Sequence, residues 1–167
     1  MFRRFLLLVS LSFSFGGFSF YAAVVVPIGG EVLDATSQGF VTREVTRVIN
    51  AVMAVTLLIV SWEAIAGRRN RSRWANRTWS ASIALWGLCC MALVGLHPRL
   101  DSFLDLDGFT VDEPLGFYRL HQVYLWISTV QWLVSLAVIW LLVGSWRDAD
   151  RATTRAAASV SPSLRSG

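Results

Sequence analysis

The sequence predicts an all-α integral membrane protein, a four-helix bundle whose N and C termini both lie in the cytoplasm. Of the 167 residues, 54% are hydrophobic and only 16% are charged, unlike the composition of an average soluble domain. The apolar residues gather in four long runs, and a helix needs roughly 20 such residues to cross a membrane. All fifteen basic residues are arginines, and they are spread unevenly over the segments between these runs. Length, apolarity and charge distribution thus all indicate a multi-pass membrane protein.

The first helix is predicted over residues 5–28. Arg3 and Arg4 precede it, as basic residues precede a secretory signal peptide, but the apolar stretch is about twice as long as the apolar region of such a peptide. We therefore expect a retained helix that ends near Pro27.

The second helix is predicted over residues 44–66, where a polar start gives way to a continuous apolar run. The third is predicted over residues 79–96, because Pro98 disfavours helix in the residue before it. The fourth is predicted over residues 117–145. These boundaries leave only short connections between the helices.

The charge of the connections predicts their sides of the membrane. Residues 68–77 carry five arginines and no acid, whereas residues 97–116 carry five acids and a single arginine, Arg99. The positive-inside rule places the first connection in the cytoplasm and the second outside. Eleven arginines then lie inside and four outside, as expected for a protein of the cell inner membrane.

One transmembrane domain, residues 1–148, accounts for all four helices. Residues 149–167 are rich in Ala, Ser and Thr and show no apolar periodicity. We expect them to form a disordered cytoplasmic tail.

Polar residues in the fourth helix are spaced three and four apart, so they share one face that avoids lipid. Asn50 of the second helix is expected to meet this face inside the bundle. Interhelical hydrogen bonds of this kind contribute about 0.6 to 2 kcal/mol each. Helix packing therefore explains the seam, and a transport path is the alternative. The residues of this polar seam are His121, Tyr124, Ser128, Gln131 and Ser135.

Ionisable residues gather where the second and fourth helices meet the outer side, and we expect a salt-bridge network there that includes Asp101. Charges within a span are usually paired or functional. Glu63, near the inner boundary, is expected to pair with Arg68 or to extend toward the headgroups. The predicted outer-mouth charges are Glu31, Asp34, Arg43, Arg47 and Arg119.

The chain has two histidines, His97 at the end of the third helix and His121 at the start of the fourth, and both are predicted at the same membrane depth. Two imidazoles on facing helices could ligate a b-type haem, or a divalent metal together with Asp101. The alternative is that each histidine only forms local hydrogen bonds. The adjacent Cys89 and Cys90 are expected to pack in the core as small apolar side chains.

Two stretches carry a resemblance to a known family. They are SFGGFSFYAAVVVP followed by DATSQGFVTREVTRVIN, and Phe117-Tyr118-Arg119-Leu120-His121. Both are similar to the transmembrane protein 205-like family of uncharacterised four-helix membrane proteins. The resemblance implies that Gln38, Arg119 and His121 are family-type positions. The chain departs from the family pattern at Gly39 and in its strongly acidic outer connection.

The sequence contains no motif for hydrolysis, nucleotide binding or covalent haem attachment, and nothing in it indicates a nucleic-acid partner. We therefore expect a non-enzymatic accessory or assembly protein of a membrane complex. Its partners would be the lipid bilayer and either another membrane protein or a second copy of the chain. One alternative is a haem- or metal-handling protein that uses His97 and His121. The other is a small-solute transporter or channel subunit whose path is lined by Tyr124, Ser128 and Gln131.

Overall fold

The computed structural model describes residues 2–68, 71–105, 110–111 and 113–160. Within these residues, four helical segments are long and apolar enough to cross a membrane. The prediction of an all-helical multi-pass membrane protein is therefore confirmed at the level of its spans, and only a two-stranded hairpin interrupts the helices.

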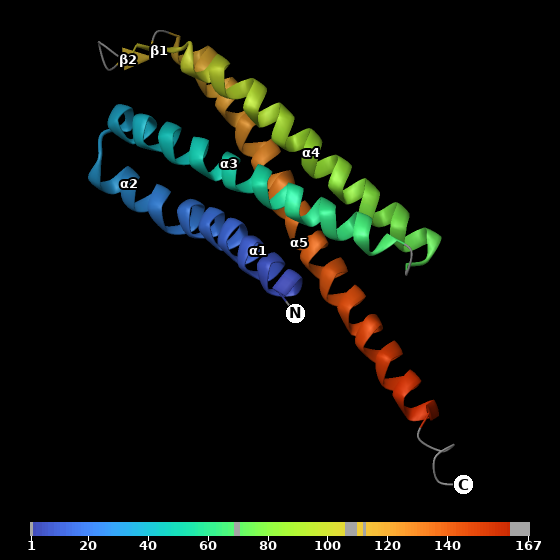
Figure 1. The fold of residues 1–167 in the computed structure, drawn as a ribbon. Helices are drawn as coiled ribbons and strands as arrows, with labels where there is room; N and C mark the ends of the chain where they lie inside the picture. Colours follow the sequence, from blue (N-terminus) through green and yellow to red (C-terminus); the bar gives the residue numbers. More distant parts are fainter. Residues whose placement is uncertain (1, 69–70, 106–109, 112, 161–167) are drawn as a thin grey trace, which may run out of the picture.

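The first span continues beyond its predicted end. It consists of α1 (Phe2–Phe20), a π-helical turn η1 (Tyr21–Val25) and α2 (Val26–Val32), which follow one another in the same direction (Figure 1). The prediction that the helix ends near Pro27 is wrong. A proline ring clashes with the preceding turn of an α-helix, but here the wider π turn directly precedes the proline and gives the ring room.

The second span, α3 (Ala35–Ala66), begins well before residue 44. Asp34 explains this early start, because its carboxylate accepts hydrogen bonds from the backbone N–H groups of Thr36 (3.0 Å) and Ser37 (2.9 Å). Such an N-cap satisfies donors that a helix leaves free in its first turn.

The third span, α4 (Arg73–Asp101), passes through Pro98 instead of ending before it. Tertiary contacts hold its last turn in place, because Leu100 is buried and Asp101 forms an ion pair with Arg43 of α3. The predicted end at residue 96 is therefore wrong.

The fourth span belongs to α5 (Pro114–Val160), which follows the antiparallel strands β1 (Leu104–Asp105) and β2 (Thr110–Val111). The prediction of disorder from residue 149 is wrong for residues 149–160, which are helical; residues 161–167 lie outside the described residues. Alanine has the highest helix propensity, and extending an existing helix needs no new nucleation.

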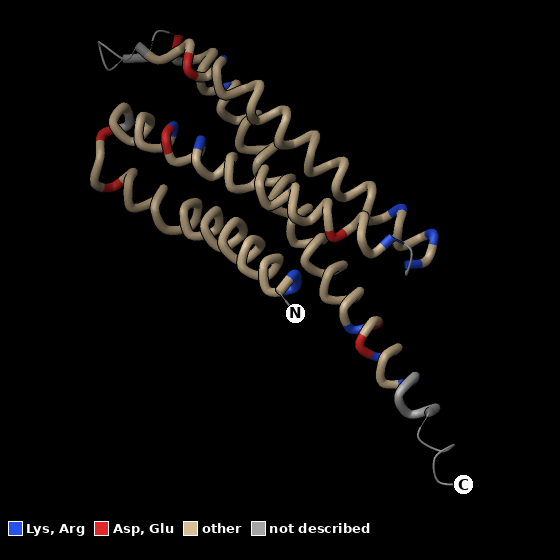
Figure 2. The backbone as a smooth tube through the Cα atoms, viewed as in Figure 1, with Lys and Arg blue, Asp and Glu red and all other residues tan. Residues whose placement is uncertain are grey.

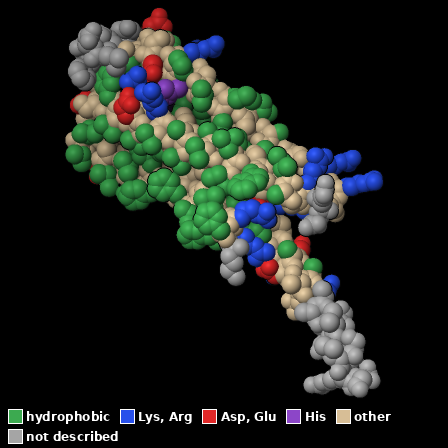
Figure 3. All heavy atoms as spheres, viewed as in Figure 1, with side chains coloured by type: hydrophobic (Ala, Val, Ile, Leu, Met, Phe, Trp, Pro, Cys, Tyr) green, Lys and Arg blue, Asp and Glu red, His purple; other side chains and the backbone are tan. Residues whose placement is uncertain are grey.

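The helices pack in sequence order: α1 lies on α3, α3 on α4, and α4 on α5, while a smaller contact between α1 and α5 completes the arrangement. Hydrophobic side chains cover much of the flank seen in Figure 3, as a surface in contact with lipid requires. The main core contains Leu7, Leu11, Met53, Val60, Trp79, Trp86, Val134, Val138 and Leu142, and a smaller cluster contains Leu93, Leu100 and Tyr124.

The two ends of the bundle differ in what they carry. One end, here called the arginine end, holds the N-terminus, the connection from α3 to α4 and the far part of α5. Most of the arginines gather at this end (Figure 2). The hairpin and the connection from α2 to α3 lie at the other, here called the hairpin end. Arg4 and Asp150 are in contact at the arginine end, so both ends of the described chain lie on that side.

Candidate functional site

The polar seam of α5 lies inside the bundle. Its members Tyr124, Ser128, Gln131 and Ser135 are each no more than 6% exposed. Ser128 and Ser135 donate their hydroxyl hydrogens to carbonyls of α5 itself, at 2.9 and 2.7 Å. These two serines are therefore satisfied without a partner on another helix.

In the region of the seam, side-chain hydrogen bonds connect α5 to each of the other spans. The Asn50 amide of α3 donates to the Tyr124 hydroxyl at 2.6 Å. The Gln131 amide donates to the sulfur of Cys90 on α4 at 3.0 Å. The third bond joins α5 to α1, because the indole N–H of Trp132 donates to the hydroxyl of Ser19 at 2.9 Å. Each of the other spans thus has a polar contact with α5 in the region of the seam.

Trp132 was missed by the sequence reasoning, although it is four residues from Ser128 and so borders the seam. Its ring also stacks on Phe15, with the ring centroids 5.3 Å apart and the planes at 17°. A tryptophan in an apolar run resembles any other lipid-facing residue, so only its spacing from the seam could have indicated its role.

The outer-mouth charges form a smaller network than predicted. Arg43 binds both carboxylate oxygens of Asp101, at 2.6 and 3.0 Å, and also contacts Glu44 at 2.9 Å. Arg47 lies 4.0 Å from Glu44.

The remaining predicted outer charges do not join this network. Asp34 instead caps α3, and hydrogen bonds from the hydroxyl and backbone N–H of Ser37 hold its pKa below the usual value. Glu31 and Arg119 form no ion pair with any residue that the structure describes.

The two histidines do not assemble the predicted metal site. His97 lies 3.9 Å from Asp101, whose oxygens already bind Arg43, and His121 stacks on Phe117 with ring centroids 5.8 Å apart. Across the described part of the chain, no group of three or more His, Cys, Asp or Glu side chains could hold a metal ion. His97, His121 and Asp101 therefore do not form such a group in this structure, and the haem hypothesis stays a prediction.

Glu63 is a buried carboxylate at the arginine end, only 4% exposed. Its Oε2 atom lies 2.7 Å from the Nε atom of Arg3 on α1, so the two side chains form an ion pair. The geometry of this contact is not that of a hydrogen bond. The predicted pair with Arg68 is therefore wrong, because α1 brings its own arginine closer.

Arg71 lies beside this pair. Its guanidinium covers the ring of Trp79 at 4.3 Å and donates to the carbonyl of Ala64 at 3.2 Å. Burial lowers the pKa of Arg71 from its ordinary value, and the negative charge of Glu63 opposes this effect. The inner arginines thus serve partly to fix the ends of α1, α3 and α4.

Gln38 connects the first two spans at the hairpin end. Its amide donates to the carbonyl of Val26 at 2.8 Å. The side chain lies directly over Gly29 and Gly30, where an added Cβ would come within 3.4 and 3.5 Å of it. A Cβ at either position would make only ordinary van der Waals contact with Gln38, so its bond to Val26 does not require the two glycines.

No family model, curated protein or solved structure matches this chain.

Proposed function

We propose that the chain is a non-enzymatic accessory or assembly protein of a membrane complex, placed in the inner membrane with both ends in the cytoplasm. The observation that carries this proposal is the length of α5, whose last turns pass well beyond the other helices (Figure 1). Residues 151–160 of α5 are here called the arm. Such an extension presents a surface to a partner outside the membrane.

The base of the arm is fixed to the bundle. Arg4 contacts both carboxylate oxygens of Asp150, at 3.2 and 2.9 Å, and its guanidinium lies 5.4 Å from the centre of the Trp146 ring. These contacts join the first and last spans at the point where α5 leaves the bundle. The direction of the arm is therefore set by the transmembrane domain.

The arm itself has few internal contacts that stabilise it. Residues 151–155 are exposed, Arg151 lies 3.9 Å from Asp148, and the hydroxyl of Thr154 bonds to the backbone carbonyl of Asp150. An exposed polar helix that bridges to another domain can be stabilised by that contact. An accessory protein that docks its partner on this arm accounts for both the extension and its polarity.

The seam also supports a structural role for the transmembrane domain. Asn50, Gln131 and Trp132 each use a donor to join α5 to a different helix. Interior polar groups that bind one another hold the spans in register, which is what a scaffold for a larger complex requires.

The test is chemical cross-linking in native membranes, followed by purification of the full chain and of a chain that ends after Asp150. The full chain is expected to retain a cross-linked partner that the shortened chain loses. A chain that ends after Val160 is the matched control and should keep the partner. Equal recovery with the full and the shortened chain, or no cross-linked partner with either, would refute the proposal.

A further inference from the structure

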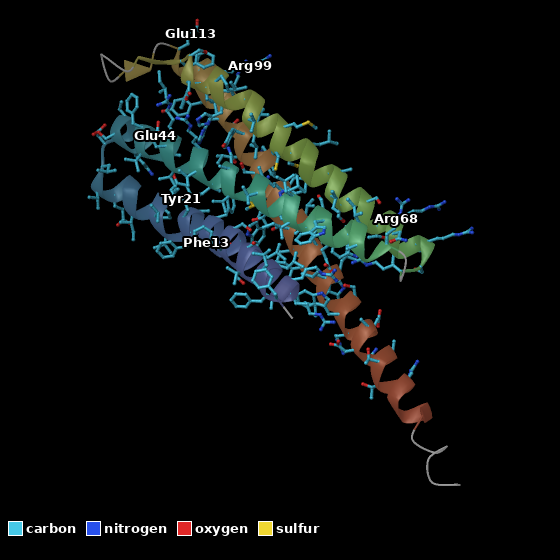
Figure 4. The ribbon with its side chains drawn as sticks, viewed as in Figure 1. Phe13, Tyr21, Glu44, Arg68, Arg99 and Glu113 are labelled. Atoms are coloured by element: carbon cyan, nitrogen blue, oxygen red, sulfur yellow. The ribbon has the colours of Figure 1, made fainter. Side chains whose placement is uncertain are left out.

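A shallow groove at the hairpin end separates the last turn of α4 from the first turns of α5. Its volume is about 480 Å³. Arg99 and Arg119 line it together with apolar side chains, and Figure 4 labels Arg99 at this end, close to Glu113 and far from Arg68. The lining residues are Arg99, Ser102, Phe103, Gly116, Arg119, Leu120 and Val123.

Neither guanidinium group of the groove has a partner among the residues that the structure describes. Within the part of the chain that the structure describes, neither Arg99 nor Arg119 forms an ion pair, a side-chain hydrogen bond or a ring contact. Arg43, at the same end, is by contrast occupied by Asp101 and Glu44. Two unpaired guanidinium groups beside one groove favour a negatively charged occupant.

The groove lies near the ends of two candidate spans. The third candidate span ends at Asp101 and the fourth begins at Leu115, so both arginines lie within one or two turns of a span end, where headgroups are expected. Trp126, which is 72% exposed, is about 10 Å deeper than Arg119 along α5, given a rise of 1.5 Å per residue. Interfacial tryptophans mark the boundary between headgroups and acyl chains.

Among the described residues, the acid Glu113 lies near the rim. The Oε2 atom of Glu113 is 3.3 Å from the position that a Cβ on Gly116 would take, and the ring of Phe103 is 3.1 Å from the same position. A second negative charge on the ligand would meet this carboxylate, whereas an ammonium group would be attracted to it. The groove thus offers cations for a phosphate, an anion for an ammonium group and apolar side chains for the glycerol region.

We propose that this groove binds one phosphatidylethanolamine molecule. Arg99 and Arg119 hold its phosphate, Glu113 faces its ammonium group, and Leu120 and Val123 contact the start of its acyl chains. Guanidinium groups bind phosphate oxygens through paired, charge-assisted hydrogen bonds, and basic pockets between transmembrane helices bind lipid headgroups in this way. The proposal is independent of the accessory role, because it concerns the end of the bundle opposite the arm.

The test uses the delipidated full chain in detergent, titrated with phosphatidylethanolamine and observed by native mass spectrometry. The wild type is expected to bind one lipid. The double variant Arg99→Gln, Arg119→Gln should bind it about tenfold more weakly or worse, because hydrogen bonds to charged groups are lost. Arg47→Gln is the matched control, since Arg47 is an exposed arginine at the same end outside the groove, and it should bind like the wild type.

Gly116→Leu tests the groove without changing its charge. Its side chain would meet Phe103 and Glu113 and fill the space between α4 and α5. We expect a similar loss of lipid, with a melting temperature in detergent close to that of the wild type. This variant decides the test if the double variant does not fold.

Three results would overturn the proposal. The first is equal binding by the wild type and the folded groove variants. The second is equal binding of diacylglycerol, which lacks the phosphate, or of phosphatidylglycerol, which lacks the ammonium group. The third is saturable binding of inorganic phosphate that depends on Arg99 and Arg119 and displaces the lipid, which would identify free phosphate as the ligand.

Discussion

At the scale of residues, α5 is the helix that the other spans share through hydrogen bonds. Asn50, Cys90 and Ser19 each come from a different helix and each bonds to a side chain of α5. In lipid, the hydrophobic effect does not drive helices together, so packing and such bonds determine their arrangement. The loss of one bond should therefore weaken the bundle measurably without unfolding it.

Tyr124→Phe should lower the free energy of unfolding by about 0.5 to 2 kcal/mol, in the range of interhelical hydrogen bonds in membranes. The change removes the hydroxyl that accepts from Asn50 and leaves a buried amide unpaired. Denaturant unfolding in bicelles would measure the loss. Tyr118→Phe is the matched control, because Tyr118 is 60% exposed. Equal stability of the two variants would show that the bond contributes nothing.

Asp34 provides a pH dependence at the start of α3. Hydrogen bonds from Ser37, with a smaller one from the Thr36 N–H, lower its pKa in the folded state. The cap's contribution is therefore fully present above the unfolded-state pKa of about 3.9 and is lost as the pH falls through the lower folded-state value.

A carboxyl-carbon NMR titration in micelles should accordingly place the pKa of Asp34 below the value of about 3.9 that an aspartate has in model peptides. Asp34→Asn keeps a capping oxygen but cannot titrate, so the start of α3 should become insensitive to pH in this range. A pKa for Asp34 at or above the ordinary value would contradict the cap seen in the structure.

At the scale of elements, the sequence predicted the number of spans and their apolar centres, because bilayer thickness and backbone hydrogen bonding allow few other solutions. Every span nevertheless extends beyond at least one predicted end, although α3 ends at Ala66 as predicted. Pro27 and Pro98 indicated helix ends, but a π turn accommodates the first and a contact between Arg43 and Asp101 holds the turn that contains the second. Such tertiary contacts cannot be read from local sequence.

For the candidate site, the sequence predicted which residues face the interior but not which partners they meet. Spacing alone placed Tyr124 and Gln131 on one face, and the structure buries both. Partners depend on how helices are rotated against one another, which is why Glu63 meets Arg3 instead of Arg68 and why the histidines do not form a metal site with Asp101.

Gln38→Ala should loosen the connection between α2 and α3. The Gln38 amide holds the carbonyl of Val26 from across the turn, at 2.8 Å. Without it, backbone amides of residues 26–32 should exchange with solvent faster, as measured by hydrogen exchange and mass spectrometry. Gly39→Ala is a suitable control, because a Cβ there meets nothing within 4 Å. Unchanged exchange in Gln38→Ala would mean that other contacts hold this turn.

At the scale of the whole molecule, the arginine end and the hairpin end should lie on opposite sides of the membrane. Nine of the arginines that the structure describes belong to segments at the arginine end, and positively charged segments stay in the cytoplasm. The arm of α5 leaves the bundle at the same end. The proposed docking of a cytoplasmic partner and the charge distribution therefore require the same orientation.

Cysteine labelling can test this orientation in cells. The background variant Cys89→Ala, Cys90→Ser removes the native thiols and keeps an acceptor for Gln131. In that background, a membrane-impermeant maleimide should label Val32→Cys, at the hairpin end and 74% exposed, in intact cells. Thr153→Cys, on the exposed part of the arm, should react only after permeabilisation. The reverse pattern would place the arm outside and would exclude a cytoplasmic partner for it, whereas labelling of both sites in intact cells would show mixed orientations.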